Sequence, residues 1–137
     1  GWGRADRARC QHLFYGVLRH LGRLEAEGVS RVARPPRPSV QAVLLLAGFE
    51  LMEAGADTGR VARIVHHAVE RTKEVASPAE ARLVNAVVRR MAEPLSAPVG
   101  AAPGDPVQTL ARAFSHPEWL VERWRKAFGA EATHRLL

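Results

Sequence analysis

The sequence of 137 residues has one cysteine, few aromatic residues and no long apolar run. Cys10 alone cannot form an internal disulfide or a metal site made of several thiolates. The longest uninterrupted apolar stretch is the eight residues 42–49, which is too short to cross a membrane. The N-terminus also lacks the basic and then apolar pattern of a signal peptide. We therefore expect a cytoplasmic protein with no membrane partner and no bound metal.

Lysine is scarce as well, although the chain is basic. Twenty basic residues oppose fourteen acidic ones, a formal net charge of +6, and only Lys73 and Lys126 among the twenty are lysines. The planar guanidinium group binds phosphate with two hydrogen bonds and stacks on bases, so an arginine-rich chain is typical of RNA or DNA binding. Codon bias in a GC-rich genome would give the same composition, and composition leaves both interpretations open.

Apolar residues repeat at the helical period in four segments, and no segment alternates like a strand. The four segments are residues 6–29, 39–54, 59–76 and 78–93. The expected N-caps are Asp6, Ser39, Asp57 or Thr58, and Ser77. A break in the first segment is expected near Gly22 or Gly28, and Leu45 and Val65 are expected in the core. The pattern predicts an all-α fold, a helical bundle.

A stretch rich in proline and glycine, residues 96–106, interrupts this periodicity. We predict a bundle over residues 1–95, a linker over 96–106 and a short helical extension over 107–137. In that extension Ser115 and Glu118 have the spacing of a capping box. Gly129 is the expected end of the helix that follows.

No motif of a catalytic or cofactor site occurs in the sequence, neither GxGxxG nor GxxxxGK[ST]. His66 and His67 are adjacent in a predicted helix and point about 100° apart, so we expect them on the polar surface and not on a shared metal. Cys10 falls on the apolar face of the first predicted helix, where we expect a small buried residue. We assign no catalytic, cofactor-binding or metal-binding residue to this chain.

Arginines are concentrated in two regions. Residues 1–40 carry a net charge of +5, whereas residues 96–137 carry only +1. The candidate RNA-binding residues are Arg9, Arg19 and Arg23 near the N-terminus and Arg82, Arg89 and Arg90 in the fourth predicted helix. The alternative is a solvated helix face, on which Arg89 and Arg90 complement the negative end of their helix. No aromatic residues are interleaved with these arginines as they are in many nucleic-acid sites.

Four sequence motifs together resemble one family. The segments 13–19 (LFYGVLR), 46–52 (LAGFELM) and 83–90 (LVNAVVRR) are similar to helices of NusB-like domains. Segment 115–124 (SHPEWLVERW) resembles the connection from such a domain to the catalytic part in the RsmB/Sun/Fmu group, which methylates C5 of cytosine in 16S rRNA. The resemblance extends over nearly the whole chain, from Asp6 to Leu137.

This resemblance implies a NusB-like bundle that binds ribosomal RNA and accompanies a C-terminal catalytic domain using S-adenosylmethionine. It also implies that the region of segment 115–124 contacts that catalytic domain. The residues concerned are His116, Pro117, Trp119, Leu120 and Trp124. The sequence departs from the family where His66-His67 replaces the usual Asn-Glu, and the family's opening helices and catalytic domain are absent from it. We therefore expect an N-terminal piece of such an enzyme.

Two other interpretations remain open. In the first, the chain is a stand-alone NusB-like protein that acts in transcription antitermination with RNA and protein partners. In the second, it is an interaction domain whose arginines serve only solubility. The segment 115–124 favours the methyltransferase interpretation, because a free-standing protein has no catalytic domain for that segment to contact.

Overall fold

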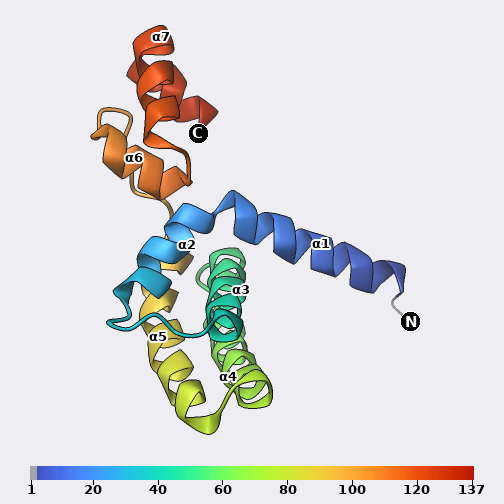
Figure 1. The fold of residues 1–137 in the computed structure, drawn as a ribbon. Helices are drawn as coiled ribbons and strands as arrows, with labels where there is room; N and C mark the ends of the chain where they lie inside the picture. Colours follow the sequence, from blue (N-terminus) through green and yellow to red (C-terminus); the bar gives the residue numbers. More distant parts are fainter. Residues whose placement is uncertain (1–2) are drawn as a thin grey trace. The chain divides into compact units, whose positions relative to one another are not determined.

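The computed structural model describes residues 3–137 and, within them, contains helices and no strand (Figure 1). The elements are α1 (Arg4–Arg19), α2 (Leu21–Glu27), the 3-10 turn η1 (Val29–Arg31), α3 (Pro38–Ala54), α4 (Thr58–Val75), α5 (Pro78–Ser96), α6 (Val107–Phe114) and α7 (Glu118–Leu136). The prediction of an all-α fold is confirmed. The chain divides into two compact units, one ending at Pro98 and the other beginning at Val99.

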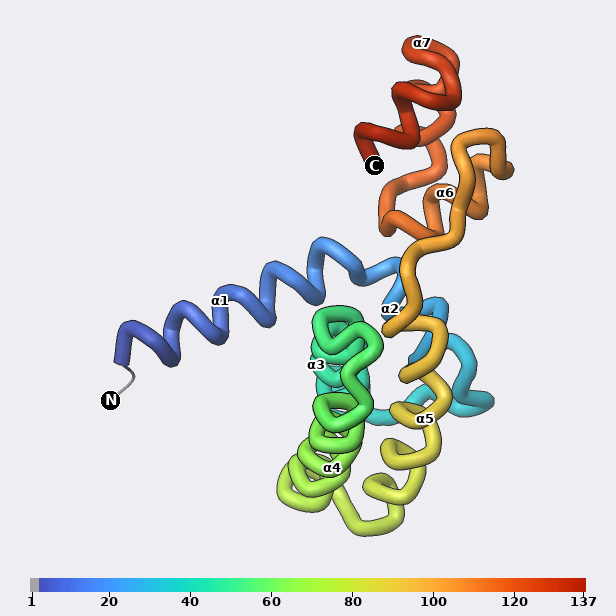
Figure 2. Tube along the Cα trace, turned by 180° about the vertical axis from the view of Figure 1, so that it is seen from behind, coloured from blue at the N-terminus to red at the C-terminus, as the bar shows by residue number. Residues whose placement is uncertain are grey.

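The core of the first unit is formed by α3, α4 and α5, which lie side by side in both views (Figures 1 and 2). The helix α3 is apolar nearly all round, and it is the element that packs on α1, α2, α4 and α5. Val65 of α4 is buried as predicted, whereas Leu45 of α3 is only partly buried. Its neighbour Leu44 takes the core position, with no exposed surface.

The break that we expect in the first predicted helix is confirmed. The backbone of His20 (φ −112°, ψ 17°) ends α1 and precedes α2, so this break lies two residues before Gly22, and Gly28 is the C-cap of α2. The helix α1 has no buried residue and extends beyond the bundle (Figures 1 and 2). Cys10 is exposed, which corrects the expectation of a buried residue. An apolar stripe places its residues on one helix face, but burial also requires a neighbouring element.

Two of the predicted N-caps are confirmed. Asp57 accepts a hydrogen bond from the backbone N–H of Arg60 at 3.1 Å, and Ser77 accepts one from Glu80 at 3.2 Å. Two others are wrong. Asp6 lies inside α1 and accepts from the N–H of Gly3, and Ser39 lies inside α3, which begins one residue earlier.

Proline explains the earlier start of α3. Pro38 occupies the first position of that helix, where its fixed φ is suited and its missing N–H leaves no hydrogen bond unmade. The helix α5 also runs past its expected end, because Pro94 is accommodated inside it and Ser96 is its last residue.

The second unit is a pair of helices around Leu110, Ala111 and Val121. The expected capping box at Ser115 is wrong: Ser115 ends α6 in the left-handed conformation (φ 55°, ψ 51°), and Pro117 precedes α7. Gly129 (φ 83°) interrupts α7 as predicted, and a second helical stretch follows it. Residues 99–106 also pack into this unit, since Arg125 donates to the carbonyl oxygens of Pro103 and Asp105.

Candidate nucleic-acid and interdomain surfaces

Arg9 takes part in the contact between α1 and α3. Its Nη2 lies 3.6 Å from Oε2 of Glu50, and one turn later Nε2 of His12 lies 2.6 Å from Oε2 of Glu53. The Arg9 side chain remains 55% exposed. Its charge is therefore partly compensated, although it is still accessible from solvent.

Arg23 has a structural partner. Its Nη2 donates to the carbonyl oxygen of Pro94 at 2.9 Å and to that of Ala97 at 3.4 Å, which joins α2 to the end of α5. The last carbonyl groups of a helix have no partner inside it, so a guanidinium group placed there stabilises the helix end. Burial lowers the pKa of the Arg23 guanidinium, and nearby Glu27 opposes that shift.

Arg19 lies beside His20 at the break between α1 and α2. Burial lowers the pKa of the His20 imidazole, and the positive charges of Arg19 and Arg23 lower it further. His20 also stacks on Phe49, with ring centroids 6.1 Å apart. Arg9 and Arg19 are ten residues apart on α1, which turns them about 80° from each other and separates them by about 15 Å along the axis. The three N-terminal candidates therefore do not form one group.

The candidates on α5 are arranged differently. Arg82, Arg89 and Arg90 are all exposed, and within the described residues none of them makes an ion pair. Arg82 and Arg89 are seven residues apart and therefore lie on one face, about two turns from each other, while Arg90 is turned by about 100° from Arg89. Arg89 donates through Nε to Oδ1 of Asn85 at 3.0 Å.

The helix-end interpretation of Arg89 and Arg90 is wrong. Because α5 continues to Ser96, these residues precede its last turn, which contains no basic residue. A charge interacts with the helix dipole mainly within the last turn. The positive group at the C-terminal end of α5 is instead Arg23 of α2, which donates to the carbonyl oxygen of Pro94.

The five predicted interdomain residues differ in exposure. Pro117 and Trp119 are exposed, and Trp119 shows 62% of its surface. His116, Leu120 and Trp124 are partly buried inside the second unit. The His116 ring lies 6.0 Å from that of Trp124, and its Nδ1 is 2.7 Å from the carbonyl oxygen of Phe114. The structure therefore separates two exposed residues from three that are partly buried in the unit.

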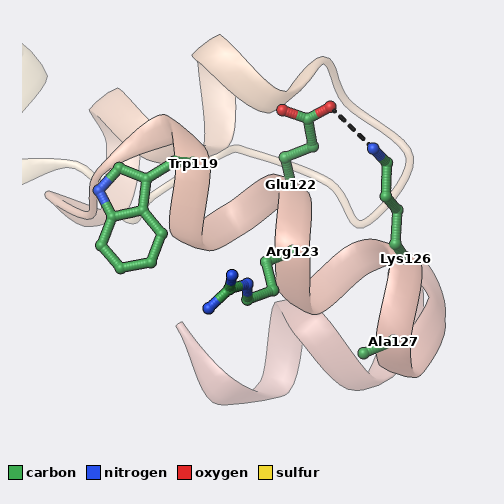
Figure 3. A pocket seen from close by; sticks show the side chains of 5 residues that line it. All are labelled: Trp119, Glu122, Arg123, Lys126 and Ala127. Carbon is green, nitrogen blue, oxygen red and sulfur yellow. Dashed lines mark ion pairs between the residues drawn. The ribbon is translucent and has the colours of Figure 1, made fainter.

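An open hollow of about 450 Å³ on α7 is lined by Trp119, Glu122, Arg123, Lys126 and Ala127 (Figure 3). The guanidinium carbon of Arg123 lies 5.9 Å from the centroid of the Trp119 ring, within the range of a cation–π interaction. Figure 3 also shows the ion pair between Lys126 and Glu122, whose atoms are 3.3 Å apart. Sequence reasoning missed Arg123, although the spacing of four residues from Trp119 was a signal for this contact.

Two further expectations concern other kinds of site. His66 and His67 are exposed, as predicted, with ring centroids 5.6 Å apart. Across residues 3–137, no group of three or more His, Cys, Asp or Glu side chains is arranged to hold a metal ion. In the same part of the chain, no helix combines the length and apolar character that crossing a membrane requires.

Three known proteins are similar in sequence to this chain, and the aligned share of the chain differs among them. The chain is 36% identical to ribosomal RNA small subunit methyltransferase B of Thermus thermophilus over 93% of its own length, and 32% identical over 96% to the "Probable ribosomal RNA small subunit methyltransferase B" of Bacillus subtilis. It is 36% identical to transcription antitermination protein NusB of Laribacter hongkongensis over 66% of its length. The chain spans 28% and 29% of the two methyltransferases and 56% of the antitermination protein.

No solved structure matches the chain significantly. The model of the NusB family matches residues 3–93, which include α1 to most of α5. That match covers well over half of the sequence and contains three of the four motifs that carry the resemblance. The chain therefore belongs to the NusB family.

Proposed function

We propose that this chain is the RNA-binding accessory part of an S-adenosylmethionine-dependent rRNA (cytosine-C5) methyltransferase, in which it positions rRNA for a catalytic domain. The observation that carries the proposal is the extent of similarity. The two methyltransferases match 93% and 96% of the chain, including the second unit, whereas the antitermination protein matches 66%. The similarity to the methyltransferases thus includes the segment that the stand-alone alternative leaves without a role.

The exposed arginines of α5 are the proposed RNA-binding surface. Arg82, Arg89 and Arg90 have no acidic partner within the described residues, so their charges are available to phosphate groups. Arg9 and Arg19 form a second, weaker contribution, because Arg9 is partly compensated by Glu50. We leave Arg23 out of this surface, since its guanidinium group holds the end of α5.

Replacing Arg89 and Arg90 by glutamine tests the RNA-binding role. We expect weaker binding of a small-subunit rRNA fragment and a salt slope flatter by about one unit for each phosphate group that is no longer bound, because binding a phosphate releases counterions. Fluorescence anisotropy across a salt series measures both quantities. Helical circular dichroism should be unchanged, since exposed charges contribute little to stability.

The matched control replaces Arg63 and Arg71, two exposed arginines of α4, by glutamine. It removes the same charge from another helix. An equal loss of affinity in the control pair would mean that net charge alone attracts RNA, and unchanged binding in the Arg89/Arg90 variant would remove the RNA role from this surface.

The second unit is proposed to dock on the catalytic domain through Pro117 and Trp119. His116, Leu120 and Trp124 maintain the shape of that surface from inside the unit. A large exposed aromatic side chain gains most from a partner that buries it. S-adenosylmethionine would supply the methyl group in the catalytic domain. We assign no residue of this chain to the cofactor and derive no step through it.

The docking role predicts a specific effect of Trp119→Ala in a methyltransferase that carries this sequence as its N-terminal part. Calorimetry should show the unfolding transition of this part separating from that of the catalytic domain. The control is Phe128→Ala on the same helix, because Phe128 is similarly exposed (58% against 62%). A Trp119→Ala profile identical to that of the unchanged enzyme would contradict the docking role.

A further inference from the structure

A groove of about 300 Å³ lies between α4 and α5, a volume at the lower end of the range for ligand sites. The residues that line it are Val69 and Lys73 of α4 and Pro78, Ala81, Arg82 and Asn85 of α5. It shares no lining residue with the hollow on α7. Of the six lining residues, only Arg82 belongs to the arginine candidates that the sequence indicates.

The groove combines an apolar wall with a polar rim. Val69 of α4 is partly buried and Pro78 of α5 is exposed, with the buried Ala81 between the helices, so both helices present an apolar surface to the groove. Lys73 and Arg82 are exposed, one from each helix. A ligand seated there would meet apolar surface on one side and positive charge at the edge.

The hydrogen-bonding groups at the rim are mostly donors. Oδ1 of Asn85 accepts from Arg89, which leaves the amide N–H groups of Asn85 without a partner within the described residues. Nζ of Lys73 lies 2.9 Å from Oε1 of Glu70, and this hydrogen bond lowers the pKa of the Glu70 carboxyl group, with the nearby His66 adding to the shift. Exposed ion pairs of this kind contribute little, so a phosphate group can replace Glu70 at Lys73.

We infer that this groove binds one nucleotide of single-stranded RNA. The base lies against Val69 and Pro78, and the adjoining phosphate groups contact Lys73 and Arg82. An N–H of Asn85 donates to an oxygen of the base or the ribose. This inference rests on the proposed RNA-binding function and gives that function a location.

A nucleotide suits the groove better than an acidic peptide does. An acidic side chain uses the cations but leaves the apolar wall uncovered, whereas a nucleotide has both an anionic group and a flat, largely apolar ring. The guanidinium group of Arg82 can also bind phosphate with two hydrogen bonds. Arg89, on the same face of α5, extends the positive surface beyond the groove.

Two variants of the full chain test the site. Val69→Trp fills the groove and keeps every charge, whereas Lys73→Gln with Arg82→Gln removes the rim cations and keeps the shape. The control is Arg71→Gln, because Arg71 is an exposed cation of α4 about 160° around the helix from Lys73. The probe is a short single-stranded RNA containing 4-thiouridine, read out by anisotropy and by mapping the photo-crosslinked residues. Circular dichroism verifies that each variant is folded.

We expect Val69→Trp to weaken binding about 3- to 10-fold, because the bulkier side chain occupies the place of the base; this is the lower end of what one base contributes by stacking on an aromatic ring. The Lys73/Arg82 variant should flatten the salt slope by about two units, one for each phosphate group bound at the rim. Crosslinks should map to residues of the groove in the unchanged chain and in Arg71→Gln, and disappear in the other two.

The outcomes separate this inference from the function on which it rests. RNA binding that is unaffected in both groove variants, with crosslinks elsewhere, would overturn the nucleotide site and leave the RNA-binding function standing. Absence of RNA binding by the unchanged chain would overturn both. Displacement of the RNA by an acidic peptide, but not by nucleoside monophosphates, would assign the groove to a protein partner and overturn the inference.

Discussion

Replacing Leu44 by alanine is expected to lower the free energy of unfolding of the first unit by about 2–5 kcal/mol. Leu44 lies in α3 with no exposed surface, in the core formed with α4 and α5. The variant loses the transfer free energy of the removed carbons and leaves a cavity that three packed helices can close only in part. Urea denaturation followed by helical circular dichroism measures the change. Fluorescence of Trp119 and Trp124 reports on the second unit.

Leu45→Ala is the matched control, because it deletes the same atoms from the neighbouring position of α3. Leu45 is only partly buried, so its loss should cost clearly less. Equal losses at the two positions would contradict the assignment of Leu44 to the core.

The sequence could not choose between Leu44 and Leu45. In α4 and α5, apolar residues occupy one stripe, and the stripe identifies the buried face directly. In α3 nearly every position is apolar, so periodicity shows that the helix is central but not which side chains face each neighbour. The caps at Asp57 and Ser77 were predictable because they are local contacts: each hydrogen bond joins residues three apart in the sequence.

Features that depend on distant residues were not predictable in this way. Arg23 was a candidate for RNA from its charge alone, yet its partner is the carbonyl group of Pro94, 71 residues further along the chain. Likewise, the spacing of Ser115 and Glu118 fits a capping box, but Ser115 adopts the left-handed conformation that ends α6. The arginine cluster of α5 was predictable because it lies on one helix. The groove residues Lys73 and Asn85 were missed because they come from two helices.

The same limit applies to α1, on whose apolar face the sequence predicts a buried Cys10. Phe14, Tyr15 and Leu18 are 60%, 62% and 51% exposed, and only Leu13 and Val17 of this helix pack against the core. Besides the pairs that Arg9 and His12 make with α3, the contact includes a close approach at Gly16. A Cβ atom built there would lie 2.1 Å from Cζ of Phe49, far inside van der Waals contact.

Gly16→Ala is therefore expected to release α1 from α3, although alanine favours a helix by up to about 1 kcal/mol over glycine. The Phe49 ring has little room to move, because it is 6% exposed and the rings of His12 and His20 lie 5.4 and 6.1 Å from it. Overpacking at such a contact costs about 1–3 kcal/mol, and displacement of α1 also breaks the pair between His12 and Glu53. Hydrogen exchange should show α1 losing protection while α3 to α5 retain theirs.

Gly59→Ala is the control for the helix propensity of alanine. Gly59 lies in the first turn of α4, and a Cβ atom there would meet only Oδ1 of Asp57, at 3.4 Å. This variant should be neutral or slightly stabilising, with the protection of α1 unchanged.

A second substitution tests whether Phe49 is the obstacle. Phe49→Leu shortens the side chain that the new methyl group meets, so the double variant should cost less than the sum of the two single changes, and α1 should regain part of its protection. Strict additivity, or full protection of α1 in Gly16→Ala alone, would contradict the proposed contact. Partial recovery would establish that Gly16, by allowing Phe49 to lie against the backbone of α1, is required for α1 to pack on α3.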